Sequence, residues 1–116
     1  MQAGQFMNVY IWEAAIMQWH PISILSSPMD SNYRFLIKAD GSWSKKLLKV
    51  AKNKPEALKH VRLEGPYGSL TIKPLREYKM LLMIAGGVGV TPIMSCLKDL
   101  LQFDESVRPP SWKKDA

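Results

Sequence analysis

The chain has 116 residues, of which 47% are hydrophobic and 22% are charged, so its composition is that of one soluble globular domain and excludes disordered and fibrous proteins. Sixteen Lys and Arg against ten Asp and Glu give a net charge of +6, which favours anionic partners such as nucleotide phosphates. The single cysteine, Cys96, excludes an intrachain disulfide, and the two histidines have no ligand cluster around them, so we expect no metal site.

Three short segments near the N-terminus carry the residue pattern of β-strands. They are residues 5–12, 22–27 and 33–39, which are rich in β-branched and aromatic residues or alternate between apolar and polar side chains. The sequences between them contain Pro, Gly, Asp, Asn and Ser, which are typical of turns. The pattern predicts three strands, the third with Phe35 and Ile37 on one face.

From Trp43 the hydrophobic period becomes that of a helix. Leu47, Leu48 and Ala51 recur at helical spacing with lysines opposite, and Ser44 is a candidate N-cap. We interpret the lysine run as a solvated helix face. The lysines carry no aromatic-interleaved basic motif, which argues against nucleic acid as a partner.

After this helix the alternation of a strand returns. Residues 60–65 predict a strand with Val61 and Leu63 facing inward, and residues 65–69, GPYGS, predict a tight turn. Residues 71–79 are expected to be a polar connection. No apolar run reaches the length that a membrane-spanning helix requires.

Residues 78–86 form a nearly continuous apolar run, which is typical of a strand buried on both faces of a parallel sheet. A helix is predicted to follow, capped by Thr91, with Pro92 at its first position. Its predicted apolar stripe comprises Ile93, Leu97, Leu100 and Leu101. The tail, residues 103–116, has no periodicity and is expected to be irregular or mobile.

The sequence AGGVGVTP lies between the predicted strand and this helix. Gly86, Gly87 and Gly89 would let backbone amides and the positive end of the helix approach a diphosphate. Pro92 stands where the third glycine of the usual dinucleotide fingerprint would lie. A turn that joins a strand to a helix and binds nothing remains an alternative.

The sequence HPISILSSP begins the second predicted strand. Pro21 restricts His20 to an extended backbone, so its ring can project from the strand start, and Ser23 follows two residues later. A flat aromatic ligand with polar edges could use such a strand, although a loop histidine with surface serines explains the pattern equally. Hydrolysis is disfavoured because no nucleophile elbow surrounds Ser23 and no carboxylate is placed to orient His20.

The sequence DGSWS opens the lysine-rich helix. Gly41 supplies turn flexibility, and residues 42–44 form a helix N-terminus that could accept a second phosphate. The alternative is a simple helix cap with Trp43 as a hydrophobic staple. The segment EGPYG, taken alone, indicates only a turn.

Taken in order, the sequences AGQF, HPIS, IKADGSWS, EGPYG and AGGVGVTP resemble the flavin- and nicotinamide-binding region of the ferredoxin reductase-like superfamily. The resemblance covers residues 4–101. The His-Pro-x-Ser motif is similar to the branch that contains ferric-chelate reductases and NADPH oxidases. The implied fold is mixed: a partial antiparallel β-barrel in residues 1–77, followed by the first β-α unit of an α/β nucleotide-binding domain in residues 78–116.

The resemblance also implies roles for individual residues. Ser23 would face the flavin edge near N5 and act as the catalytic residue by orienting it, with His20 towards the FAD phosphates. The other residues that would hold FAD are Pro21, Ile22, Ile37, Lys38, Gly41, Trp43 and Ser44. The residues that would hold NADPH are Gly86, Gly87, Gly89 and Thr91.

The implied chemistry is hydride transfer from NADPH to FAD, then electron transfer to haem in a transmembrane portion and on to ferric iron or dioxygen. We therefore expect an oxidoreductase at the cytoplasmic face of a membrane, as part of a membrane protein. The family barrel has six strands and the resemblance begins near the third, so we expect the chain to be part of a longer reductase. An inactive remnant is the first alternative. A soluble NAD(P)H-flavin reductase is disfavoured by His20, because those proteins have arginine there.

Overall fold

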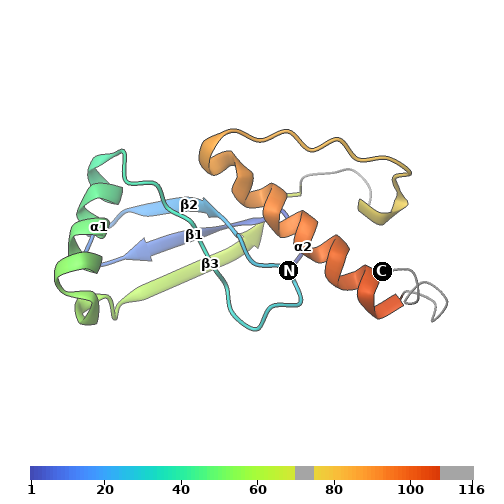
Figure 1. Ribbon diagram of the computed structural model, residues 1–116. Coiled ribbons are helices and arrows are strands. Elements are labelled where there is room, and N and C mark those ends of the chain that lie inside the picture. The colour runs from blue at the N-terminus through green and yellow to red at the C-terminus, as the bar shows by residue number, and fades with distance from the viewer. Residues whose placement is uncertain (70–74, 108–116) are drawn as a thin grey trace.

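The computed structural model describes residues 1–69 and 75–107, with the backbone alone for residues 103–107. A three-stranded antiparallel sheet lies beside two helices, α1 at one end of the sheet and α2 at the other (Figure 1). In chain order the elements are β1 (Phe6–Ile11), β2 (Trp19–Ser23), α1 (Ser42–Asn53), β3 (Val61–Tyr67) and α2 (Val90–Val107). Short 3₁₀ turns span Pro55–Ala57, Leu75–Glu77 and Gly87–Gly89.

Strand β1 is the centre of the sheet, whose strand order is β2-β1-β3. It confirms the strand predicted at residues 5–12, and its burial alternates, with Met7, Val9 and Ile11 buried. Val9 and Ile11 form a core cluster with Ala14 and Trp43, so α1 is anchored to the sheet through Trp43. Burying each large apolar side chain stabilises the fold by about 1.5–3 kcal/mol.

The prediction of a third strand at residues 33–39 is wrong. Among the described residues this segment forms one isolated β-bridge, between Phe35 and Ile24, and no continuous strand. Strand β2 also begins and ends earlier than predicted, because Ser26 and Ser27 leave the sheet and bond to other elements. The Ser26 hydroxyl accepts from the Arg34 amide at 3.1 Å, and such side-chain bonds to the backbone replace ladder bonds.

Strand β3 confirms the strand predicted at residues 60–65 but extends to Tyr67. Val61 and Leu63 are not the buried positions that the alternation predicted; they are 47% and 40% exposed in β3, an edge strand of the sheet. The predicted tight turn at residues 65–69 is also wrong. The register with β1 shifts between Phe6 and Asn8, so Gly65 belongs to an irregularity within the strand, at a φ of 126° that favours glycine.

Residues 78–86 are not the buried strand that the apolar run predicted. Met80 and Leu82 are 87% and 86% exposed. Hydrophobicity alone cannot make a strand, because the backbone needs a neighbouring strand to complete its hydrogen bonds. Among the described residues no strand lies beside this segment.

Helix α2 follows, and two of its predicted features need correction. It runs to Val107, so residues 103–107 are helical and not irregular, while residues 71–74 and 108–116 lie outside the described residues. The buried positions are Thr91, Ser95 and Cys96, whereas Leu97 and Leu101 of the predicted stripe are exposed. Burial raises the pKa of the Cys96 thiol, which disfavours a reactive thiolate.

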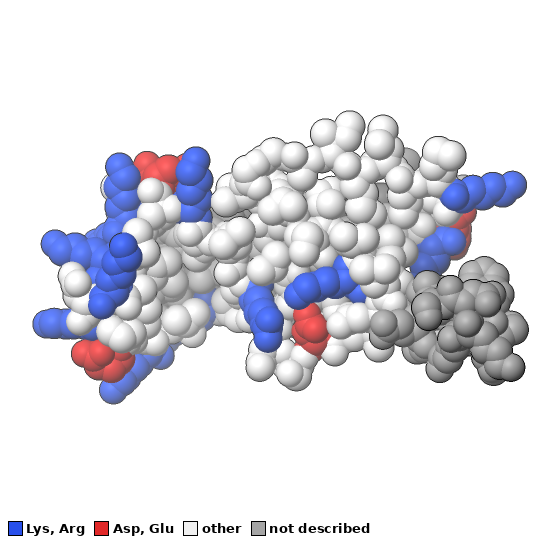
Figure 2. Space-filling view, viewed as in Figure 1, with Lys and Arg blue, Asp and Glu red and all other residues white. Residues whose placement is uncertain are grey.

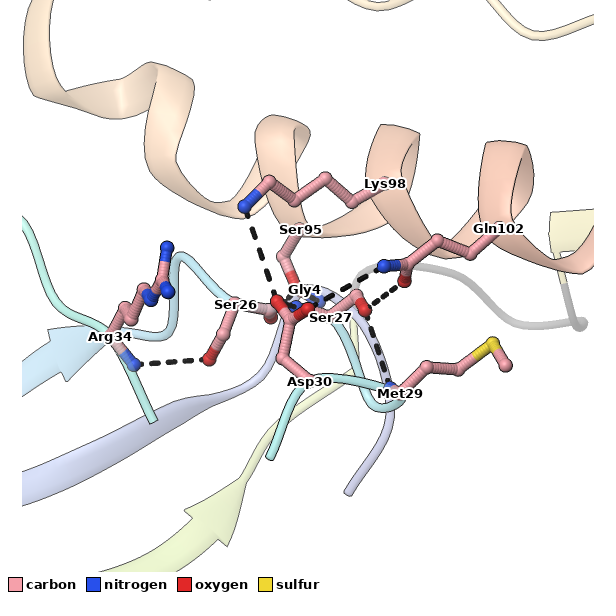
Figure 3. Close-up of polar contacts among 9 residues, drawn as sticks. All are labelled: Gly4, Ser26, Ser27, Met29, Asp30, Arg34, Ser95, Lys98 and Gln102. Carbon is pink, nitrogen blue, oxygen red and sulfur yellow. Dashed lines mark hydrogen bonds and ion pairs between the residues drawn. The ribbon is translucent and has the colours of Figure 1, made fainter. Parts of the chain in front are cut away.

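A buried polar network docks α2 against the loop that follows β2 (Figure 3). The Ser95 hydroxyl donates to the Ser26 carbonyl oxygen at 2.6 Å, and the Gly4 amide donates to Ser95 Oγ at 3.4 Å. The Ser27 hydroxyl donates to Gln102 Oε1. These contacts hold the start of α2 beside the end of β2, which positions the cleft described below.

The sheet is open among the described residues, since β2 and β3 are both edge strands, and a closed barrel is not observed. In the parts of the chain that the structure describes, neither helix combines the length and the hydrophobicity that crossing a bilayer demands.

Candidate functional site

A cleft of about 490 Å³ lies where β2, residues 36–41, the start of α1 and the start of α2 meet. Four stretches that are far apart in sequence therefore contribute to one hollow. Its lining residues are His20, Pro21, Ile22, Ser23, Leu36, Ile37, Lys38, Asp40, Gly41, Ser42, Trp43, Ser44, Val88 and Thr91.

Strand β2 supplies one wall of the cleft. The His20 ring stacks on the Trp43 indole, with centroids 4.0 Å apart and planes 21° from parallel. Trp43 is buried in the core cluster, so it fixes the position of the imidazole. The Ser23 hydroxyl has no hydrogen-bond partner among the described residues and stands available to a ligand.

The N-terminus of α1 supplies a second part of the lining. The N-cap is Gly41 and not Ser44, as the sequence had predicted. Ser44 is the third helical residue, and its hydroxyl reaches back, accepting from the Gly41 amide at 3.0 Å and from the Asp40 amide at 3.2 Å. These two bonds hold the turn in place. Because the cap residue is glycine, no side chain projects from it into the cleft.

The start of α1 is electrostatically suited to an anion. Its first turn carries no acidic residue. The first amides of any helix lack intrahelical acceptors and carry a partial positive charge. Lys38, also in the lining, adds a full positive charge, partly offset by Asp40, whose Oδ2 lies 4.0 Å from Lys38 Nζ. The wall therefore favours a phosphate or diphosphate group.

The turn before α2 closes the cleft. Thr91 is not the cap but the second residue of the helix, and its hydroxyl donates to the Val88 carbonyl oxygen at 2.7 Å. Gly86 caps the preceding 3₁₀ turn. A Cβ at Gly86, Gly87 or Gly89 would meet no atom within 4 Å, so the space beside all three is open to an approaching ligand.

Most of the residues predicted to bind a ligand line this single cleft. They are His20, Pro21, Ile22, Ser23, Ile37, Lys38, Gly41, Trp43, Ser44 and Thr91. The three glycines 86, 87 and 89 are not in the lining, although Val88 between them is. Ser42, which the sequence had placed at a possible phosphate-binding helix start, also lines the cleft. Sequence reasoning missed Leu36, Asp40 and Val88, all of which lie within or next to the motifs and carry no signal of their own.

Comparison with known protein families divides the chain into two parts. Residues 1–71 match the family model of an FAD-binding domain, and residues 78–112 match that of a ferric reductase NAD binding domain.

Individual relatives point the same way. The chain is 37% identical over 114 residues to ferric reduction oxidase 7, chloroplastic, of Arabidopsis thaliana, covering 85% of this chain and 15% of that protein. It is 34% identical over 119 residues to respiratory burst oxidase homolog protein A of Solanum tuberosum, covering 87% and 12%. It is 26% identical over 100 residues to NADPH oxidase 1 of Mus musculus, covering 86% and 17%.

The chain thus spans less than a fifth of the length of each of these relatives. The match to the FAD-binding domain nevertheless extends over more than half of the chain, and the second match follows it directly. The chain therefore belongs to the ferric reductase and NADPH oxidase family of FAD- and NAD(P)H-dependent oxidoreductases.

Proposed function

We propose that the cleft between β2 and α1 holds FAD, and that the chain is the part of a reductase that passes electrons from NADPH through FAD towards haem. The observation that carries this proposal is the convergence of His20, Ser23 and Ser44 on one cleft. A volume of about 490 Å³ is in the range of cofactor sites.

The residues of the cleft fit the two chemically different ends of FAD. The diphosphate would lie at the start of α1, where Gly41 leaves room and the amides of residues 42–44 point outward. Ile37 and Lys38 would flank the adenosine half. Ser23 would offer its unpaired hydroxyl to the edge of the flavin ring, and Pro21 and Ile22 would shape the strand beside it.

NADPH would approach from the side of α2. The open space beside Gly86, Gly87 and Gly89 admits the phosphates, and Thr91 faces the same cleft as Ser23. The two proposed ligand positions would then lie next to each other. Such proximity is the geometric requirement for direct transfer between them.

FAD, when bound, supplies the chemistry of accepting a hydride and releasing single electrons. The protein's own residues bind and orient. No acid or base is needed at Ser23, whose role would be to hold the acceptor ring by a hydrogen bond. This agrees with a cleft in which Asp40 is the one carboxylate of the lining.

The proposal extends to the protein's surroundings. The electron acceptor would be a transmembrane haem portion, with ferric iron or dioxygen as the final acceptor and the chain at the cytoplasmic face of the membrane. Residues 1–77 would form the FAD-binding unit, with the open sheet as part of a β-barrel. Residues 78–116 would begin the NAD(P)H-binding α/β unit.

Titration of the purified chain with FAD tests the proposal, because flavin fluorescence is quenched on binding. The informative variant is Ser42→Asp, which places a carboxylate in the first turn of α1. It should stabilise the helix by about 0.3–1 kcal/mol through the helix dipole, yet weaken FAD binding about tenfold by repelling the diphosphate.

Ser31→Asp is the matched control, since Ser31 is exposed, lies outside the cleft, and the change adds the same single negative charge. FAD affinity that is equal in wild type and Ser42→Asp would refute the assignment of the diphosphate to α1. A chain that leaves FAD fluorescence unquenched would instead support the inactive-remnant alternative.

A further inference from the structure

The end of the molecule that carries α1 is strongly basic, and the flavin and nicotinamide sites do not use this charge. Figure 2 shows Lys and Arg gathered over this end, with small acidic patches among them. We call this surface the basic end. Its exposed cations are Lys45, Lys46, Lys49, Lys52, Lys59 and Arg62, none of which forms an ion pair with a residue that the structure describes.

Helix geometry concentrates this charge on one face. At 3.6 residues per turn, Lys45, Lys49 and Lys52 fall on one side of α1, while Trp43 and Leu47 fall on the other and pack on the core. The lysines therefore point away from the protein. Their charges add up over a small area, and none of the three lysines forms an ion pair with a described carboxylate.

The loop between β1 and β2 emerges at the same end and is apolar at its tip. Ile16 and Met17 are 59% and 85% exposed, and Trp12 and Trp19 flank them with about half of their surface in solvent. Met17 has a φ of 62°, an unfavourable backbone conformation for a residue with a side chain. A strained backbone that holds an apolar side chain in water calls for a functional reason.

This loop is fixed to the basic end by several bonds. The Trp12 amide donates to the His60 carbonyl oxygen at 3.3 Å, and His60 Nδ1 lies 2.9 Å from Glu13 Oε1. The Met17 amide donates to the Tyr10 hydroxyl. The exposed apolar side chains are thus presented by an ordered scaffold next to Lys59 and Arg62.

A second hollow, of about 450 Å³, lies between the loop and these cations. It is lined by Tyr10, Trp12, Lys59, His60, Val61 and Arg62. Aromatic rings beside two cations suit a group that is anionic at its head and apolar behind it. No ligand of the proposed reductase function accounts for this hollow.

We propose that the basic end and the β1–β2 loop together form a docking surface for an anionic phospholipid bilayer. Ile16 and Met17 enter the acyl boundary, Trp12 and Trp19 lie at headgroup depth, and the lysines bind the lipid phosphates. Aromatic side chains and lysines divide in this way between the interface and the headgroups of membranes. Charge complementarity argues for the anionic lipid, and the two aliphatic side chains argue for a bilayer over a polynucleotide, whose phosphates would not use them.

Cosedimentation of the 116-residue chain with lipid vesicles tests the surface. One set of vesicles contains phosphatidylcholine alone and the other contains about one-third phosphatidylserine. We expect binding to the anionic vesicles, weakening as salt screens the charges, and at least tenfold less binding to the neutral ones. Equal binding to both, or none to the anionic set, overturns the proposal.

Two lysine variants distinguish the effect of this surface on vesicle binding from the effect of the molecule's net charge. Lys49→Glu lies on the outward face of α1, and Lys79→Glu is an exposed lysine outside the basic end, so both change the charge equally. We expect Lys49→Glu to reduce vesicle binding about tenfold and Lys79→Glu to reduce it far less. Equal losses would mean that the whole molecule's charge is responsible, and the docking surface would be wrong.

The apolar half of the surface has its own matched pair. The double variant Ile16→Ser/Met17→Ser should bind anionic vesicles about tenfold more weakly, whereas Met80→Ser/Leu82→Ser, at positions elsewhere that are at least as exposed, should bind as wild type does. Circular dichroism verifies that both retain the fold. If Ile16→Ser/Met17→Ser binds normally while a single-stranded oligonucleotide displaces the vesicles, the surface recognises polyanions and the bilayer proposal fails.

Discussion

The imidazole of His20 stacks on the indole of Trp43 at a centroid distance of 4.0 Å, and this contact joins β2 to the first turn of α1. Trp43 also belongs to the core cluster with Val9, Ile11 and Ala14. Because Trp43 is held by the core, the ring stacked on it, His20, is also held in position at the cleft. A change in Trp43 should affect stability and ligand binding together.

Substitution of Trp43 tests this coupling. Trp43→Leu should lower the free energy of unfolding by about 2–3 kcal/mol, because it leaves a cavity and removes the surface on which His20 stacks. Trp43→Phe should cost less than about 1.5 kcal/mol. It keeps a ring for the stack and removes the indole N–H, which is buried without an acceptor among the described residues.

Urea unfolding and FAD titration of both variants measure these effects. We expect Trp43→Phe to keep most of the FAD affinity and Trp43→Leu to lose it. Equal FAD affinity in the two would show that the stacked ring has no part in the cleft.

Ser23→Ala should change the rate of flavin reduction but not the binding of FAD. The Ser23 hydroxyl bonds to no other described residue, so its removal should change the free energy of unfolding by less than about 0.5 kcal/mol. FAD should be largely retained. The loss of one hydrogen bond to the flavin edge should slow flavin reduction by NADPH about tenfold.

Stopped-flow bleaching of the flavin absorbance measures this step, with the exposed Ser31→Ala as the control. Unchanged reduction kinetics in Ser23→Ala would remove this residue from the site.

Gly86 and Gly87 permit a test of the nicotinamide position. Gly86 has φ −133° and ψ 132°, an extended conformation that valine adopts readily, and a Cβ there meets open space. Gly86→Val should leave the melting temperature unchanged and weaken NADPH binding about tenfold by filling the approach. Gly87→Val should weaken NADPH binding and also lower the melting temperature, because a φ of 57° costs a branched residue about 1–2 kcal/mol.

Thermal melts and NADPH fluorescence titrations separate the two effects. If Gly86→Val bound NADPH as tightly as wild type, the glycine turn would not be the ligand's approach.

Asp30 should make the docking of α2 sensitive to acid. The hydrogen bond from the Ser27 amide, at 2.9 Å, is the main cause that lowers the pKa of Asp30 below its ordinary value of 3.8, and Gln102 and Lys98 act in the same direction against burial. A lowered folded-state pKa stabilises the fold above pH 3.8, and this contribution disappears as the pH falls through the folded-state value.

Asp30→Asn should therefore lower the urea midpoint at pH 7 but not at a pH below the folded-state pKa of Asp30. Urea unfolding at the two pH values measures the difference. A deficit of the same size at both would show that the loss comes from altered packing and not from the charge.

Local periodicity determined the elements that carry it strongly. Strand β1 follows from the β-branched and aromatic residues of segment 5–12, and α1 from leucines at helical spacing with lysines opposite. The motifs around His20, Gly41 and Gly86 could likewise be singled out as candidate ligand-binding sequences, because proline, glycine and serine restrict or free the backbone locally.

Only the tertiary structure decided what long-range contacts control. The apolar run of residues 78–86 does not form a strand, since a strand needs a partner that sequence hydrophobicity cannot supply. The caps of both helices differ from prediction because Ser44 and Thr91 bond backwards to the preceding turn. The single cleft also came from the fold: the core packing of Trp43 and the bond from Ser95 to Ser26 bring distant motifs together, and no local pattern encodes that distance.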